Sequence, residues 1–273
     1  MNSQIIFSQS ELALAAYATL NASALSAQKA SLINAGLSDV QADKFALGYT
    51  VLTQYNDTPA EGGLGTSFSA TVFKDVSGNL TLAIRGTEPG DLAPTDADIF
   101  TAGAGFDQIV AMYNWWQRVS NPEGTMVPQY QLVSTPLDPN QVIYIQASVG
   151  QWLQTMPPVA ASGTLVAALN ADGNHKLDIT GHSLGGHLAM AFGSLFQSVV
   201  NQITTFNAPG FKDTTNTRNF FSRLGGVIPS GTATTNVISD EANIGAAPWS
   251  AIAGRHSRPG TAVDIPTENQ WLT

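Results

Sequence analysis

Alternating hydrophobic and polar positions predict a β-hairpin in the first third of the chain. The positions that share a face are Phe68, Ala70 and Val72 in the first run and Leu80, Leu82 and Ile84 in the second. The sequence DVSGN between the two runs is typical of a turn. The hairpin leads into the sequence IRGTEPGD, an abrupt end for a strand.

Helical periodicity appears before this hairpin and after it. Ser8–Glu11 and Ser38–Gln41 each match a capping box at a helix start. After the second box the apolar positions recur at helical spacing, which predicts a helix that includes Phe45, Tyr49, Leu52 and Tyr55. Residues 107–120 form a further amphipathic helix, and its predicted buried face holds Ile109, Met112, Tyr113 and Trp116. Trp115 lies off that face; aromatic side chains at this spacing usually belong to the core, and the alternative is that Trp115 lines a pocket mouth.

The second half of the chain alternates between predicted helices and strands. We expect a short helix at 164–170, a strand at 176–180, a helix at 184–200, strands within QITTFNAPG (202–210) and TNVISDEA (235–242), and an extended piece at 260–266. This alternation is typical of a mainly parallel sheet with helices on both faces. The sequence has no internal repeat and no clear linker, so we expect one α/β domain over residues 1–273.

Residues 121–163 are the least regular part of the pattern, with prolines at 122, 128, 136, 139, 157 and 158. One interpretation is a lid, in which Val149, Trp152, Leu153 and Met156 present an apolar face to lipid. The other is an ordinary insertion that packs on the sheet. The sequence leaves both interpretations open.

Composition narrows the function classes. The 273 residues are 43% hydrophobic and only 11% charged, with 20 acidic and 11 basic side chains and a net charge of −9. No cluster of basic residues occurs, which argues against a nucleic-acid surface. There is no cysteine, so disulfides and thiol catalysis are excluded. No apolar run approaches the roughly 18 residues of a membrane span, and the N-terminus lacks the positive region of a secretory signal.

The stretch ITGHSLGGHLAM, residues 179–190, holds the strongest candidate for chemistry. Its residues 181–185 fit the pattern G-x-S-x-G, and they lie between a predicted strand and a predicted helix. This is the setting of a nucleophile elbow, in which Ser183 occupies a strained turn with its hydroxyl exposed. The alternative is an ordinary serine that caps the helix.

A serine nucleophile needs a histidine base and an acid, and in such folds they follow in the order serine, acid, histidine. His256 is the only histidine after Ser183 that can follow an acid; we expect His182 and His187 to be packing or hydrogen-bonding residues. The acids between them are Asp213, Asp240 and Glu241. Asp240 ends a predicted strand and is favoured, while the other two stay open. The backbone amides of Leu184 and Thr87 are the candidate oxyanion donors.

The motifs LAIRGTE, ITGHSLGGHLAM, TFNAPG and VISDE, followed by a late histidine, resemble the lipase class 3 group of α/β-hydrolases over roughly residues 60–260. Within that group the likeness is to bacterial extracellular lipases and esterases related to the calcium-dependent, type-I-secreted lipases. The resemblance implies an α/β-hydrolase fold, the triad Ser183, Asp240 and His256, and an oxyanion hole from Thr87 and Leu184. It further implies a small-molecule or lipid ester substrate, transient contact with a lipid interface, no required cofactor, and an extracellular location, although a cytoplasmic one stays open.

The chain departs from these relatives in lacking their tandem calcium repeats; EGGLGTSF at 61–68 is a single weak match. Asp91, Asp96 and Asp98 are close enough in sequence to hold calcium, but they suit solvated turns or a pair with Arg85 equally well. No specific motif indicates a metal. A phospholipase A or polyester hydrolase would use the same triad, and a binding protein that retained the fold without catalysis is the remote alternative.

Overall fold

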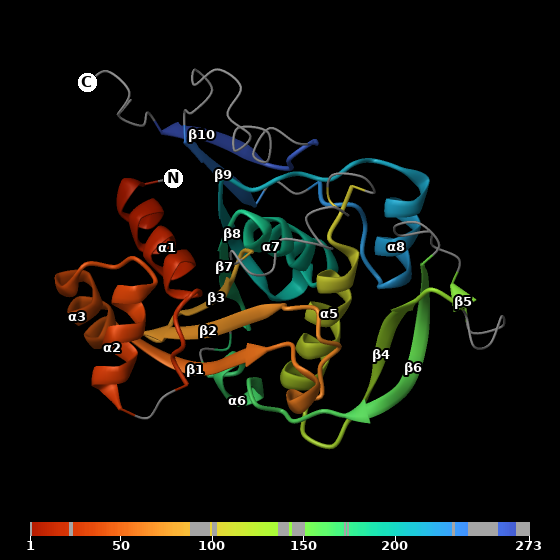
Figure 1. Ribbon diagram of the computed structural model, residues 1–273, viewed down its shortest axis with the longest axis horizontal. Helices are drawn as coiled ribbons and strands as arrows, with labels where there is room; N and C mark the ends of the chain where they lie inside the picture. Colours follow the sequence, from red (N-terminus) through yellow and green to blue (C-terminus); the bar gives the residue numbers. More distant parts are fainter. Residues whose placement is uncertain are drawn as a thin grey trace.

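A seven-stranded sheet forms the centre of the molecule (Figure 1). The computed structural model describes residues 2–21, 24–87, 99, 103–135, 142–143, 151–171, 173, 175–230, 233–239 and 256–265. In spatial order the strands are β1 (Tyr49–Asn56), β2 (Ser69–Asp75), β3 (Leu80–Ile84), β7 (Leu177–His182), β8 (Val200–Phe206), β9 (Thr234–Ser239) and β10 (Thr261–Ile265). The hairpin β2–β3 and its neighbour β1 pair antiparallel, and β3 and the four strands beyond it pair parallel. The predicted α/β class and its mainly parallel sheet are confirmed.

Helices cover both faces of this sheet (Figure 1). On one face lie α1 (Ser3–Ala15), α2 (Leu25–Asn34) and α3 (Asp39–Gly48), which share a buried apolar cluster with Phe73 and Ala83 of the sheet. On the other face lie α5 (Phe106–Ser120) and α7 (Leu184–Leu195), which form a larger cluster with Val72 and Leu82. Because neighbouring residues of a strand point to opposite faces, one hairpin supplies both cores.

The remaining helices are short. They are α6 (Val166–Leu169), α8 (Thr215–Arg223), and the 3₁₀ turns η1 (Pro59–Glu61) and η2 (Gln197–Val199). The helix that follows the nucleophile candidate is shorter than predicted, because α7 ends at Leu195 and β8 has already begun at Val200. No helix among the described residues is long and apolar enough to cross a bilayer.

The two capping boxes predicted near the N-terminus have different outcomes. The capping box at Ser38 is confirmed, because Ser38 Oγ accepts from the Gln41 amide and Gln41 Oε1 accepts from the Ser38 amide. The box at Ser8 is wrong: α1 begins at Ser3, Asn2 caps it, and Ser8 Oγ donates to the carbonyl of Gln4 inside the helix.

The predicted helix through Tyr55 is also wrong. It ends at Gly48, and the following eight residues form β1, which pairs with β2. This segment, YTVLTQYN, is rich in β-branched and aromatic side chains, which fit a pleated surface better than a helix. The edge of β2 supplies hydrogen-bond partners for the backbone of this segment from Tyr49 to Asn56. Pairing within the sheet therefore overrides the helical spacing.

The described parts of residues 121–163 form a second, antiparallel sheet instead of irregular chain. Its strands are β4 (Met126–Val133), β6 (Trp152–Ala160) and β5 (Val142–Ile143), in that spatial order. The outer edge of β4 is held by Asn114 of α5, whose side chain donates to the Tyr130 carbonyl at 2.7 Å and accepts from its amide at 2.9 Å. Leu153 is fully buried, so it contributes nothing to an exposed apolar face. Val149 lies outside the described residues, and the lid stays a prediction.

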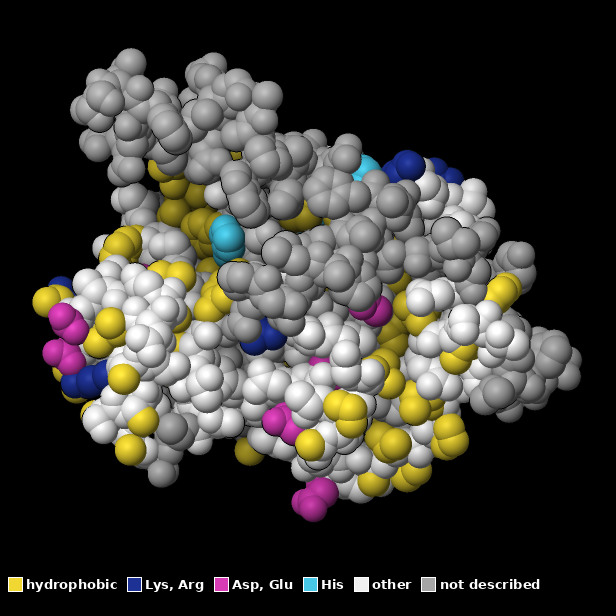
Figure 2. Space-filling view, viewed as in Figure 1, with side chains coloured by type: hydrophobic (Ala, Val, Ile, Leu, Met, Phe, Trp, Pro, Cys, Tyr) yellow, Lys and Arg dark blue, Asp and Glu magenta, His cyan; other side chains and the backbone are white. Residues whose placement is uncertain are grey.

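Apolar side chains are exposed on this second sheet. Figure 2 shows them gathered at the lower right, over β4 and β6. They include Met126, Pro128, Pro157, Pro158 and Val159, with Met126 60% exposed. Trp115, by contrast, is 2% exposed and stacks on Tyr55 with ring centroids 5.8 Å apart, so it is a core residue and the alternative place at a pocket mouth is wrong.

Candidate functional site

The stretch ITGHSLGGHLAM forms a sharp turn between β7 and α7. Ser183 has φ 54° and ψ −124°, a backbone conformation that is strained for a residue with a Cβ atom. Its amide donates to the Phe206 carbonyl of β8 at 2.8 Å, and its own carbonyl accepts from the amides of Gly186 and His187. The turn is therefore held by backbone bonds on both sides.

The Ser183 hydroxyl does not cap the helix that it precedes. Serine at this position ordinarily accepts a hydrogen bond from an amide two or three residues later, but α7 has no such side-chain cap. The side chain is only partly buried. A mostly parallel sheet between helices, with this turn at the end of a central strand, is the arrangement of the α/β-hydrolase fold. The alternative interpretation, in which Ser183 is an ordinary serine that caps the helix, is therefore wrong.

Glycines allow β7, α7 and β3 to approach one another at this turn. A Cβ atom on Gly185 would lie 2.1 Å from the Ile84 carbonyl oxygen, and one on Gly181 would lie 2.3 Å from the Gly185 carbonyl carbon. Both obstacles are backbone atoms, which no side-chain rotation can remove. The two fixed glycines of the motif thus place the start of α7 directly against the end of β3.

The candidate oxyanion donors lie at this same junction. Leu184 is the first residue of α7 and is 2% exposed; an amide in the first turn has no carbonyl of its own helix to bond. Thr87 follows Gly86, and a Cβ atom on Gly86 would meet the His182 carbonyl oxygen at 2.6 Å. The structure therefore brings the turn before Thr87 against the residue before Ser183.

His187 is fully buried and hydrogen-bonded to backbone on both ring nitrogens. The Gly105 amide donates to its Nε2 at 3.2 Å, so Nδ1 carries the proton and donates to the Pro209 carbonyl at 3.3 Å. Its ring stacks on Phe211 with centroids 3.9 Å apart. Burial lowers the pKa of His187 to about 3. It is a neutral packing residue that joins α7 to two loops, in agreement with the prediction.

His182, on the other side of Ser183, bonds through Nδ1 to the Tyr17 hydroxyl at 3.1 Å. Loss of water around the ring lowers the pKa of His182. Tyr17 belongs to the turn after α1, and its hydroxyl oxygen would lie 2.3 Å from a Cβ atom on Gly86. The sequence analysis missed this tyrosine, because no motif or spacing connects it to a serine 166 positions later.

His256 lies at the same edge of the sheet but is not bonded to Ser183. Ser257 pairs with Phe211, beyond the end of β8, in an isolated bridge. His256 Nε2 lies 2.9 Å from the Ile99 carbonyl oxygen, and because a carbonyl only accepts, Nε2 carries the proton in this structure. Among the described hydrogen bonds none connects Ser183 and His256. The predicted base lies beside the segment that follows β8, and its Nε2 is bonded to the Ile99 carbonyl.

Of the three candidate acids, only Asp213 belongs to the part of the chain that the structure describes. Asp240 and Glu241 lie outside the described residues; they follow Ser239, the last residue of β9. Asp213 is exposed and forms a two-bond ion pair with Arg218, at 2.6 and 2.9 Å. The hydrogen bond from Arg218 lowers the pKa of Asp213. An acid already paired on the surface is poorly placed to orient a histidine.

Within the described part of the chain, no group of three or more His, Asp or Glu side chains is arranged to hold a metal ion. Asp91, Asp96 and Asp98 lie outside that part. The weak calcium-repeat match at 61–68 has another explanation. Asp57 is 3% exposed and accepts hydrogen bonds from the amides of Leu64 and Thr66 and from the hydroxyls of Thr66 and Tyr55. The glycines there fold the loop around this carboxylate.

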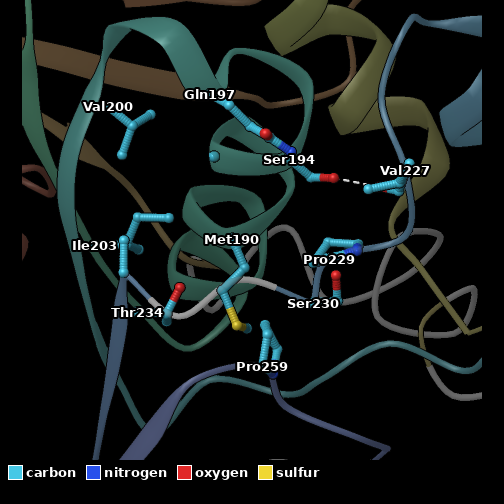
Figure 3. Close-up of a pocket in the computed structure, with 12 residues that line it drawn as sticks. Met190, Ser194, Gln197, Val200, Ile203, Val227, Pro229, Ser230, Thr234 and Pro259 are labelled. Carbon is cyan, nitrogen blue, oxygen red and sulfur yellow. Dashed lines mark hydrogen bonds between the residues drawn. The ribbon is translucent and has the colours of Figure 1, made fainter.

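A cavity of about 230 Å³ lies beside the second half of α7 (Figure 3). It is bounded by Met190 and Ser194 of α7, by the first residues of β8 and β9, Val200 and Thr234, and by Pro259. Ser194 Oγ donates to the Val227 carbonyl across its rim. Because β7 runs parallel to β8, Ser183 at the end of β7 is distant from this cavity, which is therefore not the candidate active site.

No family model matches the chain, and no curated protein matches it. Solved structures that are similar to it include three lipases. The Lip2 lipase from Yarrowia lipolytica is 13% identical with a TM-score of 0.49, over 97% of this chain and 80% of that one. The M37 lipase is 16% identical with a TM-score of 0.36, over 85% and 66%. A triacylglycerol lipase from Penicillium expansum is 12% identical with a TM-score of 0.32, over 81% and 71%.

Proposed function

We propose that the protein is a serine carboxylic ester hydrolase that acts on acyl esters through an acyl-enzyme on Ser183. The observation that carries the proposal is the conformation of this serine. It sits on a strained, glycine-packed turn between β7 and α7, and its hydroxyl is not used to cap the helix. A fold that maintains such strain, which costs about 1–3 kcal/mol, without using the hydroxyl structurally presents that hydroxyl for chemistry.

In the proposed reaction His256 removes the proton from Ser183, and the serine oxygen attacks the ester carbonyl carbon. Asp240 orients the imidazole and stabilises its protonated form. The amides of Leu184 and Thr87 hold the oxyanion of the tetrahedral intermediate, and losing one such donor typically costs about 10²–10³-fold in rate. His256 then protonates the leaving alcohol, and water attacks the acyl-enzyme by the same route. No metal or organic cofactor takes part in these steps.

The base must leave its present partner before it can act. A histidine that donates from Nε2 to the Ile99 carbonyl has its proton on the nitrogen that should accept one from Ser183. Catalysis therefore requires His256 Nε2 to separate from Ile99, and the neutral form with its proton on Nδ1 to face Asp240. The bond between His256 Nε2 and the Ile99 carbonyl is thus, under this proposal, a resting position of the base.

A fluorophosphonate probe and Ser183→Ala together test the proposal. We expect the probe to label the wild-type protein at Ser183, and the wild-type protein to hydrolyse p-nitrophenyl acyl esters. Ser183→Ala should keep its circular dichroism spectrum and lose both properties. His175→Asn, a change at an exposed histidine in the turn before β7, is the control that should keep both. Full activity in Ser183→Ala would overturn the proposal.

A further inference from the structure

We propose that Tyr17 is a positioning residue of the candidate active site. It holds the turn after β3, which carries Gly86 and Thr87, against the turn at Ser183. The inference rests on the proposed function. It concerns a residue outside 60–260, the part of the chain that carries the sequence resemblance. The hydroxyl of Tyr17 contacts the residue that precedes each of two functional positions: His182 before Ser183, and Gly86 before Thr87.

The contacts are close on both sides. Tyr17 Oη lies 3.1 Å from His182 Nδ1, a hydrogen-bond distance. The same oxygen would be 2.3 Å from a Cβ atom on Gly86, so it lies against the bare Cα of that glycine. The His182 carbonyl oxygen would lie 2.6 Å from the same Cβ atom, so both oxygens face the side of Gly86 where a side chain would project. Gly86 thus packs against both the tyrosine hydroxyl and the backbone before the nucleophile.

The position of Gly86 determines where the Thr87 amide points. The other proposed donor, Leu184, is fixed by α7 and by the packing of Gly185 on β3. The turn after β3 leaves the sheet at Ile84, and its start is held by the Arg85 amide, which donates to the Ser69 carbonyl at 3.0 Å. The contact from Tyr17 falls one residue further on, at Gly86. Tyr17 restrains this turn from the N-terminal helices, and these are themselves anchored on β7 by the bond from Thr180 Oγ1 to the Gln9 carbonyl at 3.1 Å.

Removal of the hydroxyl alone tests the role. We expect Tyr17→Phe to lower kcat for a p-nitrophenyl ester about tenfold, as expected for one hydrogen bond lost from transition-state alignment, and to leave KM within about twofold. Inactivation by a fluorophosphonate, which forms a tetrahedral adduct with an oxyanion-like oxygen, should slow by a similar factor. Tyr113→Phe is the matched control: this tyrosine of α5 has its hydroxyl bonded to Gln117 and packs against Phe196. It should change neither constant.

A double-mutant cycle separates positioning from packing. His182→Phe removes the hydrogen-bond partner of Tyr17. If Tyr17 acts through His182, the double variant should be no slower than the slower single variant. Wild-type kcat in Tyr17→Phe, or additive losses in the cycle, would overturn the inference. A raised KM with unchanged kcat would also overturn it, because it would make Tyr17 a substrate contact. A wild-type protein that neither hydrolyses esters nor reacts with the probe would instead overturn the proposed function, and this inference with it.

Discussion

The nucleophile turn and the loop that carries the proposed base lie at the same edge of the sheet, but they are built differently. The turn around Ser183 is fixed by backbone contacts with the central strands: Gly185 packs on the end of β3, and the Ser183 amide donates to the Phe206 carbonyl of β8. His256 is held by contacts from far along the chain, through the Ile99 carbonyl and the pairing of Ser257 with Phe211. In the proposed reaction the nucleophile turn is therefore preorganised, whereas His256 has to exchange partners before it can act as the base.

The largest effect is expected at Asp240, the proposed acid that orients His256. Asp240→Ala should lower kcat for a p-nitrophenyl ester by about 10⁴-fold, because the imidazole loses the group that sets its tautomer and stabilises its charge. Asp213→Ala should leave kcat unchanged, since Asp213 is exposed and paired with Arg218. Glu241→Ala is the neighbouring control and should also be active. A normal rate in Asp240→Ala with a collapse in Asp213→Ala would reverse the assignment.

On the nucleophile side, the packing of α7 on β3 can be broken with one methyl group. In Gly185→Ala the added Cβ would lie 2.1 Å from the Ile84 carbonyl oxygen and 2.8 Å from the Arg85 carbonyl carbon. Since both are backbone atoms, the strand or the helix must move, and we expect a loss of about 3 kcal/mol in the free energy of unfolding. The loss of alignment should also lower kcat.

Gly48→Ala provides the matched control for this substitution. Gly48 is the last residue of α3, and a Cβ atom there meets nothing within 4 Å. Its free energy of unfolding, measured by urea denaturation, should stay within about 1 kcal/mol of wild type. Equal stability of the two alanine variants would contradict the close approach of α7 to β3.

His187 connects α7 to two loops through its bonds to Gly105 and Pro209. The pKa of His187 is about 3 in the folded protein and near 6.5 in the unfolded chain. At pH above 6.5 both states are neutral; as the pH falls from 6.5 toward 3, only the unfolded state takes up the proton. The stability contributed by the neutral His187 ring is therefore complete above pH 6.5. It decreases as the pH falls below 6.5, and the loss is about 2 kcal/mol at pH 5.

His187→Gln isolates this effect, because it removes the titrating group and leaves the rest of the chain unchanged. The variant should be less stable than wild type at pH 7, and the difference should shrink by about 2 kcal/mol at pH 5. His175→Asn, in an exposed turn, should parallel wild type across the same range. Urea unfolding at several pH values measures both. Parallel profiles for wild type and His187→Gln would show that His187 does not titrate between the states.

The same contrast explains how much the sequence could predict. The turn at Ser183 was predictable because glycines, strand and helix are contiguous in the chain and act on one another locally. Neither the Tyr17 contact with His182 nor the Ile99 contact with His256 could be predicted, because each joins positions more than 150 residues apart. The strand β1 was predicted as a helix for a related reason: pairing with β2 decided its conformation, and local spacing did not.

The smallest expected effect measures the strain at the nucleophile turn. Glycine reaches positive φ without steric cost, so Ser183→Gly should relieve the strain at φ 54°. After the extra entropy of glycine in the unfolded chain is subtracted, we expect a gain of about 1 kcal/mol in the free energy of unfolding. Ser183→Ala is the control, since it removes the hydroxyl but keeps Cβ and should match wild type in stability. Both variants should be inactive. If glycine proved no more stable than alanine here, the turn would be unstrained, and the preorganisation of the nucleophile would rest on glycine packing alone.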